Sequence, residues 1–99
     1  MIRSISMKDL LDILSCRKIN IIDLRDNYLY LTKTIPSSKN IPANFLIMMP
    51  NEYLKKEEIY YLFCDYGIKS RKVAKRLTEL GYKVISIDGG FHEYENLTL

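Results

Sequence analysis

The chain has 99 residues, 47% of them hydrophobic and 27% charged, with few Gly or Pro. This length and composition indicate one globular domain over residues 1–99 and exclude disordered and collagen-like chains. The net charge of +3 is mild and no apolar run approaches the length of a membrane span, so we expect no binding to nucleic acid or membranes.

The first predicted elements are a short edge strand over residues 2–5 and a helix that starts at Ser6. Ser6 is a good N-cap residue, and Asp9 three positions later makes a weak variant of the capping box. The helix has one apolar face, made by Leu10, Leu11 and Leu14.

The sequence INIIDL, residues 19–24, is short and β-branched, which predicts a buried strand. The segment 26–38 has no pattern that supports an assignment. Pro36 and Pro42 argue against regular structure near them, because proline lacks an N–H and restricts the residue before it.

Residues 43–49 are predicted to form a short helix that Pro50 ends, and the polar residues 51–58 are expected to be exposed. Residues 59–63, IYYLF, give the second strong strand prediction, because aromatic and β-branched side chains favour strands.

A clear helix follows this strand and is expected to begin near Ser70. Its apolar residues fall on one face and are Val73, Ala74, Leu77 and Leu80. Gly81 is a good residue to close it. A third strand is predicted over residues 82–87, and the chain should end with a turn at Gly89 and Gly90 and one helical turn.

The order strand, helix, strand within residues 59–87 predicts a βαβ unit with parallel strands and a right-handed connection. The alternation of strands and helices along the chain predicts an α/β domain with helices on both faces of the sheet.

Two cysteines, Cys16 and Cys64, are far apart in the sequence. No closely spaced Cys or His pair exists, so we expect no metal site, and a single disulfide stays open. The sequence MIRSISMKDL lacks the apolar core of a signal peptide, which favours a cytoplasmic protein with reduced thiols.

Cys64 stands at the carboxyl end of the predicted strand 59–63, and five residues connect it to the next helix. In open α/β sheets, ligands bind at this edge. The first amides of a helix lack internal partners, so they can face an anion, and the helix dipole favours a thiolate. Gly67 allows loop N–H groups to turn inward, and Lys69 adds positive charge.

Other residues near this edge are less decisive. Asp65 would disfavour a thiolate beside it, and we expect its carboxylate to point outward. The carboxyl end of the strand 19–24 carries Asp23 and Arg25, which would share the cleft if that strand neighbours the strand 59–63; a local ion pair or turn brace is the alternative. Cys16 lacks a glycine-containing loop before a helix and matches an inert cysteine.

These residues together resemble the rhodanese family of sulfurtransferases, in its small single-domain members, over nearly the whole chain. The family's active loop Cys-x-x-Gly-x-Arg-Ser is similar to CDYGIKS at residues 64–70, where Lys69 replaces the arginine. The family's early strand ends in Asp-x-Arg, as Asp23-Leu24-Arg25 does here.

Two later motifs extend the resemblance. The central Gly-His-Ile-Pro-Gly-Ala-x-Asn-Ile-Pro is similar to KTIPSSKNIP at residues 33–42, which lacks the Gly-His and Gly-Ala pairs. The late Gly-Gly and aromatic residue resemble Gly89, Gly90 and Tyr94. The resemblance implies a small three-layer α/β domain with a parallel sheet and helices on both faces.

The resemblance also implies transfer of sulfane sulfur through a persulfide on Cys64, without a metal or an organic cofactor. Thiosulfate or another small anionic persulfide or polysulfide would be the donor, and cyanide, a small thiol or a protein thiol the acceptor. The substrate-binding residues so implied are Asp65, Tyr66, Gly67, Ile68, Lys69, Ser70 and Arg25.

A non-catalytic or regulatory binding module, or a slow sulfur carrier, is the main alternative. The presence of Cys64 argues against a dead module. Lys69 and the altered central motif favour a specialised donor over a general thiosulfate enzyme, since lysine offers a point charge where arginine offers two parallel bonds.

Three other thiol chemistries fit the spacing less well. Phosphatases of related fold need Cys-x5-Arg, but Ser70 is the sixth residue after Cys64 and Arg71 comes one later. A Cys–His hydrolase would need His92, the only histidine, as its base. A thioredoxin-type protein would need Cys-x-x-Cys, and resolution of a Cys64 persulfide by Cys16 is the two-thiol alternative.

Overall fold

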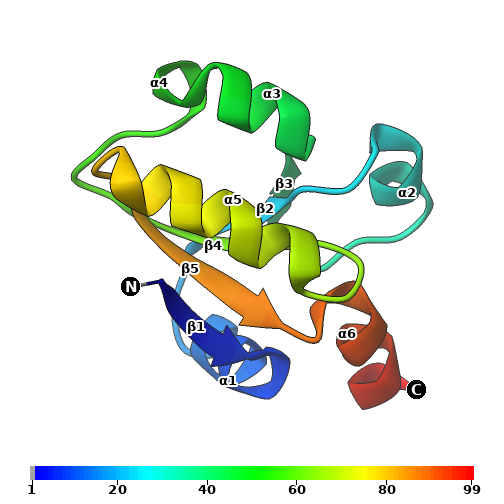
Figure 1. Cartoon of the computed structure of the whole chain (residues 1–99). Coiled ribbons are helices and arrows are strands. Elements are labelled where there is room, and N and C mark those ends of the chain that lie inside the picture. Colours follow the sequence, from blue (N-terminus) through cyan, green and yellow to red (C-terminus); the bar gives the residue numbers. More distant parts are fainter. Residues whose placement is uncertain (1) are drawn as a thin grey trace.

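Within residues 2–99, which the computed structural model describes, five strands form one parallel sheet (Figure 1). The strands are β1 (Arg3–Ser6), β2 (Asn20–Asp23), β3 (Ser38–Asn40), β4 (Ile59–Phe63) and β5 (Lys83–Asp88). Their order across the sheet is β1-β5-β4-β2-β3, which places β4 in the centre and makes β1 an edge strand.

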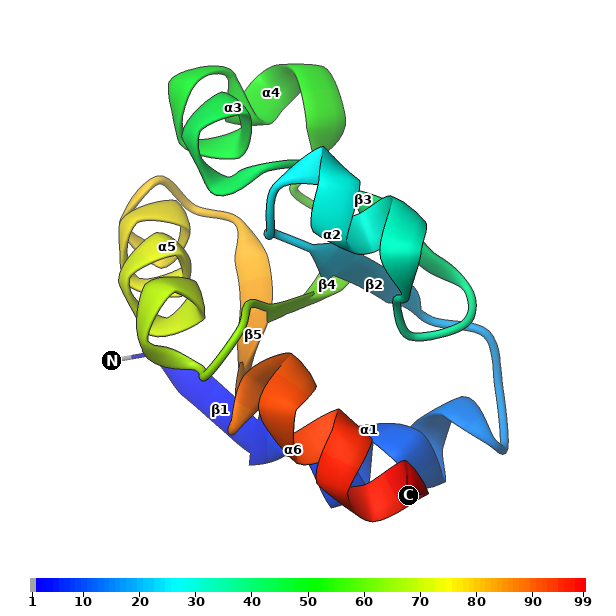
Figure 2. The same cartoon turned by 90° about the vertical axis from the view of Figure 1, so that its right-hand side faces the viewer.

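The same residues 2–99 contain six helices. They are α1 (Met7–Leu14), α2 (Asn27–Thr32), α3 (Ala43–Met48), α4 (Pro50–Tyr53), α5 (Ile68–Glu79) and α6 (Gly90–Thr98). The views in Figures 1 and 2 place α3, α4 and α5 on one face of the sheet and α1 and α6 on the other. The structure is therefore the predicted α/β fold with both faces covered. No helix in this part of the chain is long and apolar enough to cross a membrane.

Each face of the sheet has its own hydrophobic core, because successive side chains of a strand point to opposite faces. In β4, Tyr60 and Leu62 join the core beneath α3 and α5, whereas Tyr61 and Phe63 join the core beneath α1 and α6. A strand buried on both faces reads as a continuous apolar run, which is why β4 has the predicted bounds.

Several local predictions are confirmed. Ser6 is the N-cap of α1, and its Oγ accepts a hydrogen bond of 3.0 Å from the N–H of Asp9. β4 and β5 pair in parallel around α5. Gly81, with φ of 95°, follows the C-cap of α5 and ends that helix.

Two helix boundaries near the sheet's carboxyl edge were predicted wrongly. α5 begins at Ile68 rather than near Ser70, because Gly67 adopts a left-handed conformation and serves as the N-cap. α6 has nine residues instead of one turn, and Gly89, also left-handed, is its N-cap. At α5 the glycine shortens a turn that was expected to run to Lys69, whereas at α6 the turn was predicted and the length of the helix was not.

The segment around the two central prolines is more regular than predicted. β3 lies between Pro36 and Pro42, since three residues at a sheet edge need few backbone hydrogen bonds. α2 has no buried residue, so it left no hydrophobic period in the sequence. Pro50 begins α4 as well as following α3, and Leu54, expected to be exposed, is buried.

Candidate active site

The turn from β4 into α5 lies at the carboxyl edge of the sheet, beside the first turn of α6 (Figure 2). Cys64 is the first residue after β4 and Gly67 is the last before α5. The left-handed φ of 98° at Gly67 lets the chain reverse within three residues, so the thiol is drawn against the start of the helix.

The sulfur of Cys64 accepts two backbone hydrogen bonds. The N–H groups of Gly67 and Ser70 both donate to Sγ, each with an N···S distance of 3.2 Å. Cys64 is only 3% exposed, and these are the hydrogen bonds to Sγ found within residues 2–99. N–H groups at the start of a helix have no partner within the helix, and the positive end of the helix dipole lies there, so an anion can be held at such a place.

Cys64 lies in an open pocket of about 330 Å³ at the surface. The other residues that line it are Asp65, Tyr66, Ile68, Lys69 and Lys72. Tyr66 and Ile68 are 66% and 68% exposed, so the pocket has an apolar rim, while Lys69 and Lys72 make it electropositive. Asp65 is exposed, and its backbone carbonyl accepts from the N–H of His92 at 3.0 Å.

The predicted loop residues therefore come together in two layers. Four of them line the pocket with Cys64, whereas Gly67 and Ser70 are buried below and meet the sulfur through their backbone. Lys72, one turn beyond Lys69, also lines the pocket and was not predicted. Its signal in the sequence is its spacing of three residues from Lys69, which puts both on one helix face.

A buried chain of hydroxyl groups supports the loop from below. Ser70 Oγ donates to the carbonyl of Gly67 at 3.1 Å and lies 2.8 Å from Ser86 Oγ on β5. Ser70 has one hydroxyl proton, so Ser86 is the donor of the second bond. Both serines are fully buried. Sequence reasoning missed Ser86, although a serine inside the apolar run of β5 is a visible signal.

The first turn of α6 holds the loop from the other side. The N–H of Phe91 donates to the carbonyl of Cys64 at 2.8 Å. Gly90 has φ of 58°, and a Cβ there would overlap the carbonyl oxygen of Cys64 and lie 2.6 Å from that of Asp65. Gly90 is therefore required for α6 to approach the Cys64 loop so closely.

Asp23 and Arg25 form a buried ion pair rather than a cleft wall. Nε and Nη2 of Arg25 donate to the Asp23 carboxylate at 3.0 and 2.8 Å, and Nη2 also donates to the carbonyl of Lys33 at 2.7 Å. The guanidinium carbon lies 4.0 Å from the ring centroid of Phe91. β2 does neighbour β4, but Arg25 is not among the residues that line the thiol pocket.

The residues of the competing thiol chemistries make no hydrogen bond to the Cys64 sulfur among residues 2–99. Arg71 pairs with Asp88 at 3.4 Å, and the His92 ring packs on Tyr66 with centroids 5.1 Å apart. Cys16 is exposed and precedes β2, which places it at the amino edge of the sheet, opposite Cys64; both thiols are unpaired. In residues 2–99 no group of three metal-ligating side chains is arranged to hold an ion.

This arrangement would hold a Cys64 thiolate at a helix start, and no side chain among residues 2–99 is hydrogen-bonded to the sulfur. Such a thiolate can attack an electrophilic sulfur and can later leave again, and the amides can hold the charge in both states. The lysines beside it would attract an anionic substrate.

Comparisons with known proteins extend over nearly the whole chain. A family model of the rhodanese-like domain matches residues 6–97. The thiosulfate sulfurtransferase GlpE of Pseudoalteromonas translucida is 32% identical over 96 residues, covering 94% of this chain and 89% of that protein. A crystal structure of a rhodanese-like domain protein from Staphylococcus aureus superposes with a TM-score of 0.82 at 30% identity, covering 92% and 89% of the two chains.

A longer relative matches over one part only. The adenylyltransferase and sulfurtransferase uba4 of Ogataea parapolymorpha is 31% identical over 75 residues, which are 75% of this chain. The match spans only 19% of the length of that protein.

Proposed function

Because the chain belongs to the rhodanese-like domain family, with relatives named sulfurtransferases, we propose that it transfers sulfane sulfur through a persulfide on Cys64. The observation that carries this proposal is the pair of N–H groups, from Gly67 and Ser70, that donate to Sγ at the start of α5. They would stabilise both the thiolate and the persulfide anion.

In the first step the Cys64 thiolate attacks the outer sulfur of a donor such as thiosulfate. A bond forms between Sγ and that sulfur, the S–S bond of thiosulfate breaks, and its electron pair leaves with sulfite. The reaction needs no proton transfer, which agrees with the absence of a side-chain base on Sγ within the described residues.

In the second step an acceptor nucleophile attacks the outer sulfur of the persulfide. Cyanide would leave as thiocyanate and a thiolate as a new persulfide, while the electron pair of the broken S–S bond returns to Cys64 as thiolate. The enzyme ends the cycle in its starting state, without a redox partner.

Lys69 and Lys72 are assigned to attraction of the anionic donor, because both line the pocket that holds Cys64. The backbone of the 65–70 loop would contribute the remaining contacts. Arg25 has a supporting role in this proposal, since its guanidinium is committed to Asp23 and to the carbonyl of Lys33.

The deciding experiment is the intact mass of the reduced protein after incubation with thiosulfate. Wild type should gain about 32 Da, one sulfur, and lose it when cyanide is added. Cys64→Ser should gain nothing while keeping its fold by circular dichroism. Cys16→Ser is the matched control and should load like wild type, because Cys16 lies at the opposite edge of the sheet.

The result that would overturn the proposal is a wild-type protein that gains no sulfur from thiosulfate or from polysulfide. Loading of the Cys64→Ser variant would instead move the chemistry away from this residue. Stable loading with discharge too slow for turnover would favour the sulfur-carrier alternative over a thiosulfate enzyme.

A further inference from the structure

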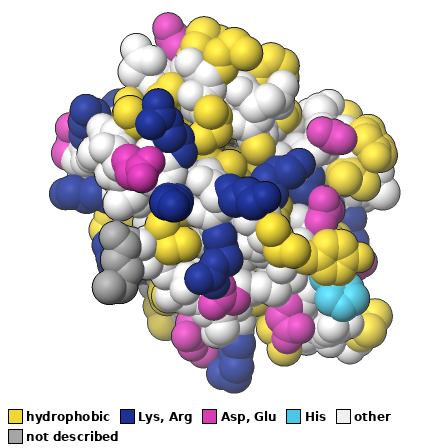
Figure 3. Space-filling model, viewed as in Figure 1, with side chains coloured by type: hydrophobic (Ala, Val, Ile, Leu, Met, Phe, Trp, Pro, Cys, Tyr) yellow, Lys and Arg dark blue, Asp and Glu magenta, His cyan; other side chains and the backbone are white. Residues whose placement is uncertain are grey.

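A stripe of positive charge runs along α5 from the thiol pocket. Its exposed cationic side chains are Lys69, Arg71, Lys72, Lys75 and Arg76. Figure 3 shows Lys and Arg side chains spread over the α5 region of this face. Lys69, Lys72 and Lys75 follow one another at intervals of three residues, so they lie near one another along the helix. We call these three residues the lysine stripe.

No carboxylate forms an ion pair with the lysine stripe among residues 2–99. Lys8, Lys33 and Lys55 each pair with a carboxylate, but no carboxylate lies within 4.0 Å of the three stripe ammonium groups. α5 has a single acidic residue, Glu79, at its last position. The stripe is therefore available to an external acidic partner.

The placement of these cations works against the stability of the helix. Lys69 lies in the first turn of α5, where the helix dipole disfavours positive charge. Like charges three residues apart also repel one another. Neither effect stabilises the helix, and a local conflict of this kind is expected at a functional surface.

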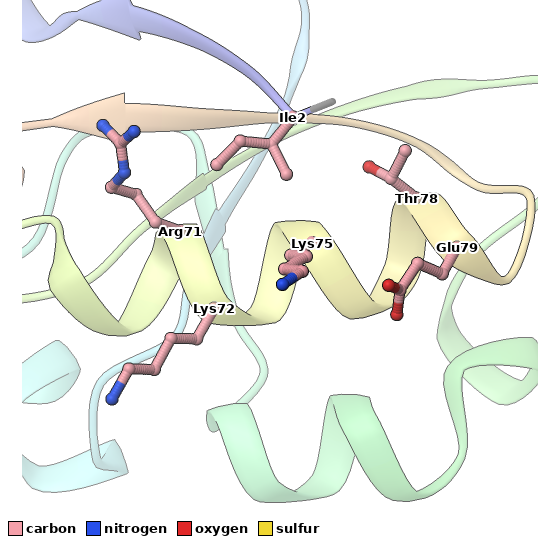
Figure 4. A pocket seen from close by; sticks show the side chains of 6 residues that line it. All are labelled: Ile2, Arg71, Lys72, Lys75, Thr78 and Glu79. Carbon is pink, nitrogen blue, oxygen red and sulfur yellow. The ribbon is translucent and has the colours of Figure 1, made fainter.

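Lys72 and Lys75 of the lysine stripe also line a surface groove of about 570 Å³ beside α5. Figure 4 shows its lining residues, with Lys75 and Glu79 following Lys72 along the helix and Ile2, which directly precedes β1, facing them. Lys72 lines this groove and also the Cys64 pocket, so the two hollows adjoin at one side chain. A bound segment of chain could therefore reach from the thiol along α5.

The mouth of the thiol pocket is apolar as well as basic. Tyr66 and Ile68 are more than half exposed on its rim. A small inorganic donor gains little from such side chains, whereas protein interfaces combine aromatic and aliphatic contacts with surrounding charges. The mild net charge of +3 also fits an acidic protein segment better than the extended backbone of a nucleic acid.

We propose that the sulfur acceptor is a cysteine on an acidic segment of another protein, which docks along the lysine stripe. This inference rests on the proposed function and specifies its acceptor. The partner thiolate attacks the outer sulfur of the Cys64 persulfide, a new S–S bond forms on the partner, and the Sγ–S bond breaks to return the Cys64 thiolate. The axial rise from Gly67 to Lys75 is about 12 Å, which about four extended residues span, so the partner's carboxylates belong two to five positions from its cysteine.

The test measures discharge of persulfide-loaded protein to two synthetic peptides. Both contain one cysteine followed by four residues that are Glu and Asp in the first peptide and Gln and Asn in the second. Lys75→Glu should slow discharge to the acidic peptide about three- to tenfold and leave discharge to the neutral peptide and to cyanide unchanged. The discharge rates of wild type and variant are compared with the same peptide, so differences in reactivity between the two peptide thiols do not affect the comparison.

Lys83→Glu is the matched control, because it makes the same charge change at the amino end of β5 and should alter no rate. The ratio of the discharge rates of wild type and Lys75→Glu to the acidic peptide should also fall between 25 and 500 mM salt, because dissolved ions screen exposed charges. Equal discharge of wild type and Lys75→Glu to the acidic peptide would overturn the proposal.

A binding measurement separates failure of docking from failure of the chemistry. Fluorescence anisotropy of the labelled acidic peptide should show Lys75-dependent binding to the unloaded protein, even if no donor forms the persulfide. A single-stranded RNA oligonucleotide that binds through Lys75 more tightly than the acidic peptide would assign the stripe to nucleic acid and overturn the proposal.

Discussion

Both donors to the Cys64 sulfur are backbone N–H groups. A side-chain substitution can therefore change these hydrogen bonds only by moving the backbone of the loop. Ser70 and Ser86 hold this backbone in place on the buried side of the loop. The environment of the sulfur therefore depends on a hydroxyl pair that never touches it.

Ser86→Ala tests this dependence. The variant removes the hydrogen bond to Ser70 Oγ but leaves the bond from Ser70 to Gly67, so unfolding free energy should fall by about 1 kcal/mol. Sulfur loading from thiosulfate should also slow, because the N–H of Ser70 is held less firmly. Urea unfolding and the loading rate are the measurements, with the exposed Ser4→Ala as control. A stability loss without any change in loading would limit Ser86 to a structural role.

Lys69→Arg tests how the pocket holds its donor. Lysine offers a point charge, whereas a guanidinium can donate two parallel hydrogen bonds to a sulfonate. We expect the KM for thiosulfate to fall about two- to fivefold in Lys69→Arg, and to rise in Lys69→Gln. Steady-state kinetics with cyanide as acceptor measures both, and an unchanged KM in the two variants would count against donor binding by Lys69.

Among the elements, α6 closes the active loop although it contributes no side chain to the thiol pocket. Its first turn donates hydrogen bonds to the carbonyls of Cys64 and Asp65, and this contact is possible because residue 90 lacks a side chain. Gly90, the first residue of α6, thus supports the candidate active site through packing.

Gly90→Ala should separate α6 from the loop. Its Cβ would meet two backbone carbonyl oxygens, which cannot move without displacing Cys64. We expect a lower melting temperature and loss of most sulfur loading. Gly81→Ala is the control: it also has positive φ, but its Cβ would meet only the flexible Lys56 side chain at 3.7 Å, so it should cost only about 1–2 kcal/mol and leave loading intact. Equal effects of the two variants would contradict this account.

At the scale of the whole molecule, the two hydrophobic cores share one sheet. Adjacent residues of the central strand, such as Leu62 and Phe63, belong to opposite cores and are both fully buried. Neither core can therefore lose its packing without exposing the strand that supports the other.

Unfolding should accordingly be one cooperative transition. Leu77→Ala on α5 and Leu10→Ala on α1 remove fully buried side chains from opposite cores, so each should lower the unfolding free energy by about 2–5 kcal/mol without splitting the transition. Urea unfolding followed together by circular dichroism and tyrosine fluorescence measures this. Leu97→Ala, at an exposed position of α6, should have little effect. Separate transitions for the two probes would show that the cores unfold independently.

The sequence by itself determined the α/β fold, the central strand β4 and the place of Cys64 at its carboxyl end. These features follow from local patterns: a continuous apolar run for a strand buried on both faces, a 3.6-residue period for α5, and a glycine that allows a tight turn. The same patterns located the loop whose amides meet the sulfur.

Only the tertiary structure decided which polar residues share the site. The residue types of Asp23 and Arg25 suit either the binding of a ligand or the bracing of a strand. In the folded chain they form a buried ion pair, and the guanidinium lies over the ring of Phe91. Ser86 and Gly90 reach the loop from distant segments, and short helices such as α2 bury no face that leaves a periodic signal. Each residue type fixes the chemistry of its own side chain, but the group that this side chain contacts depends on which segments the folded sheet brings together.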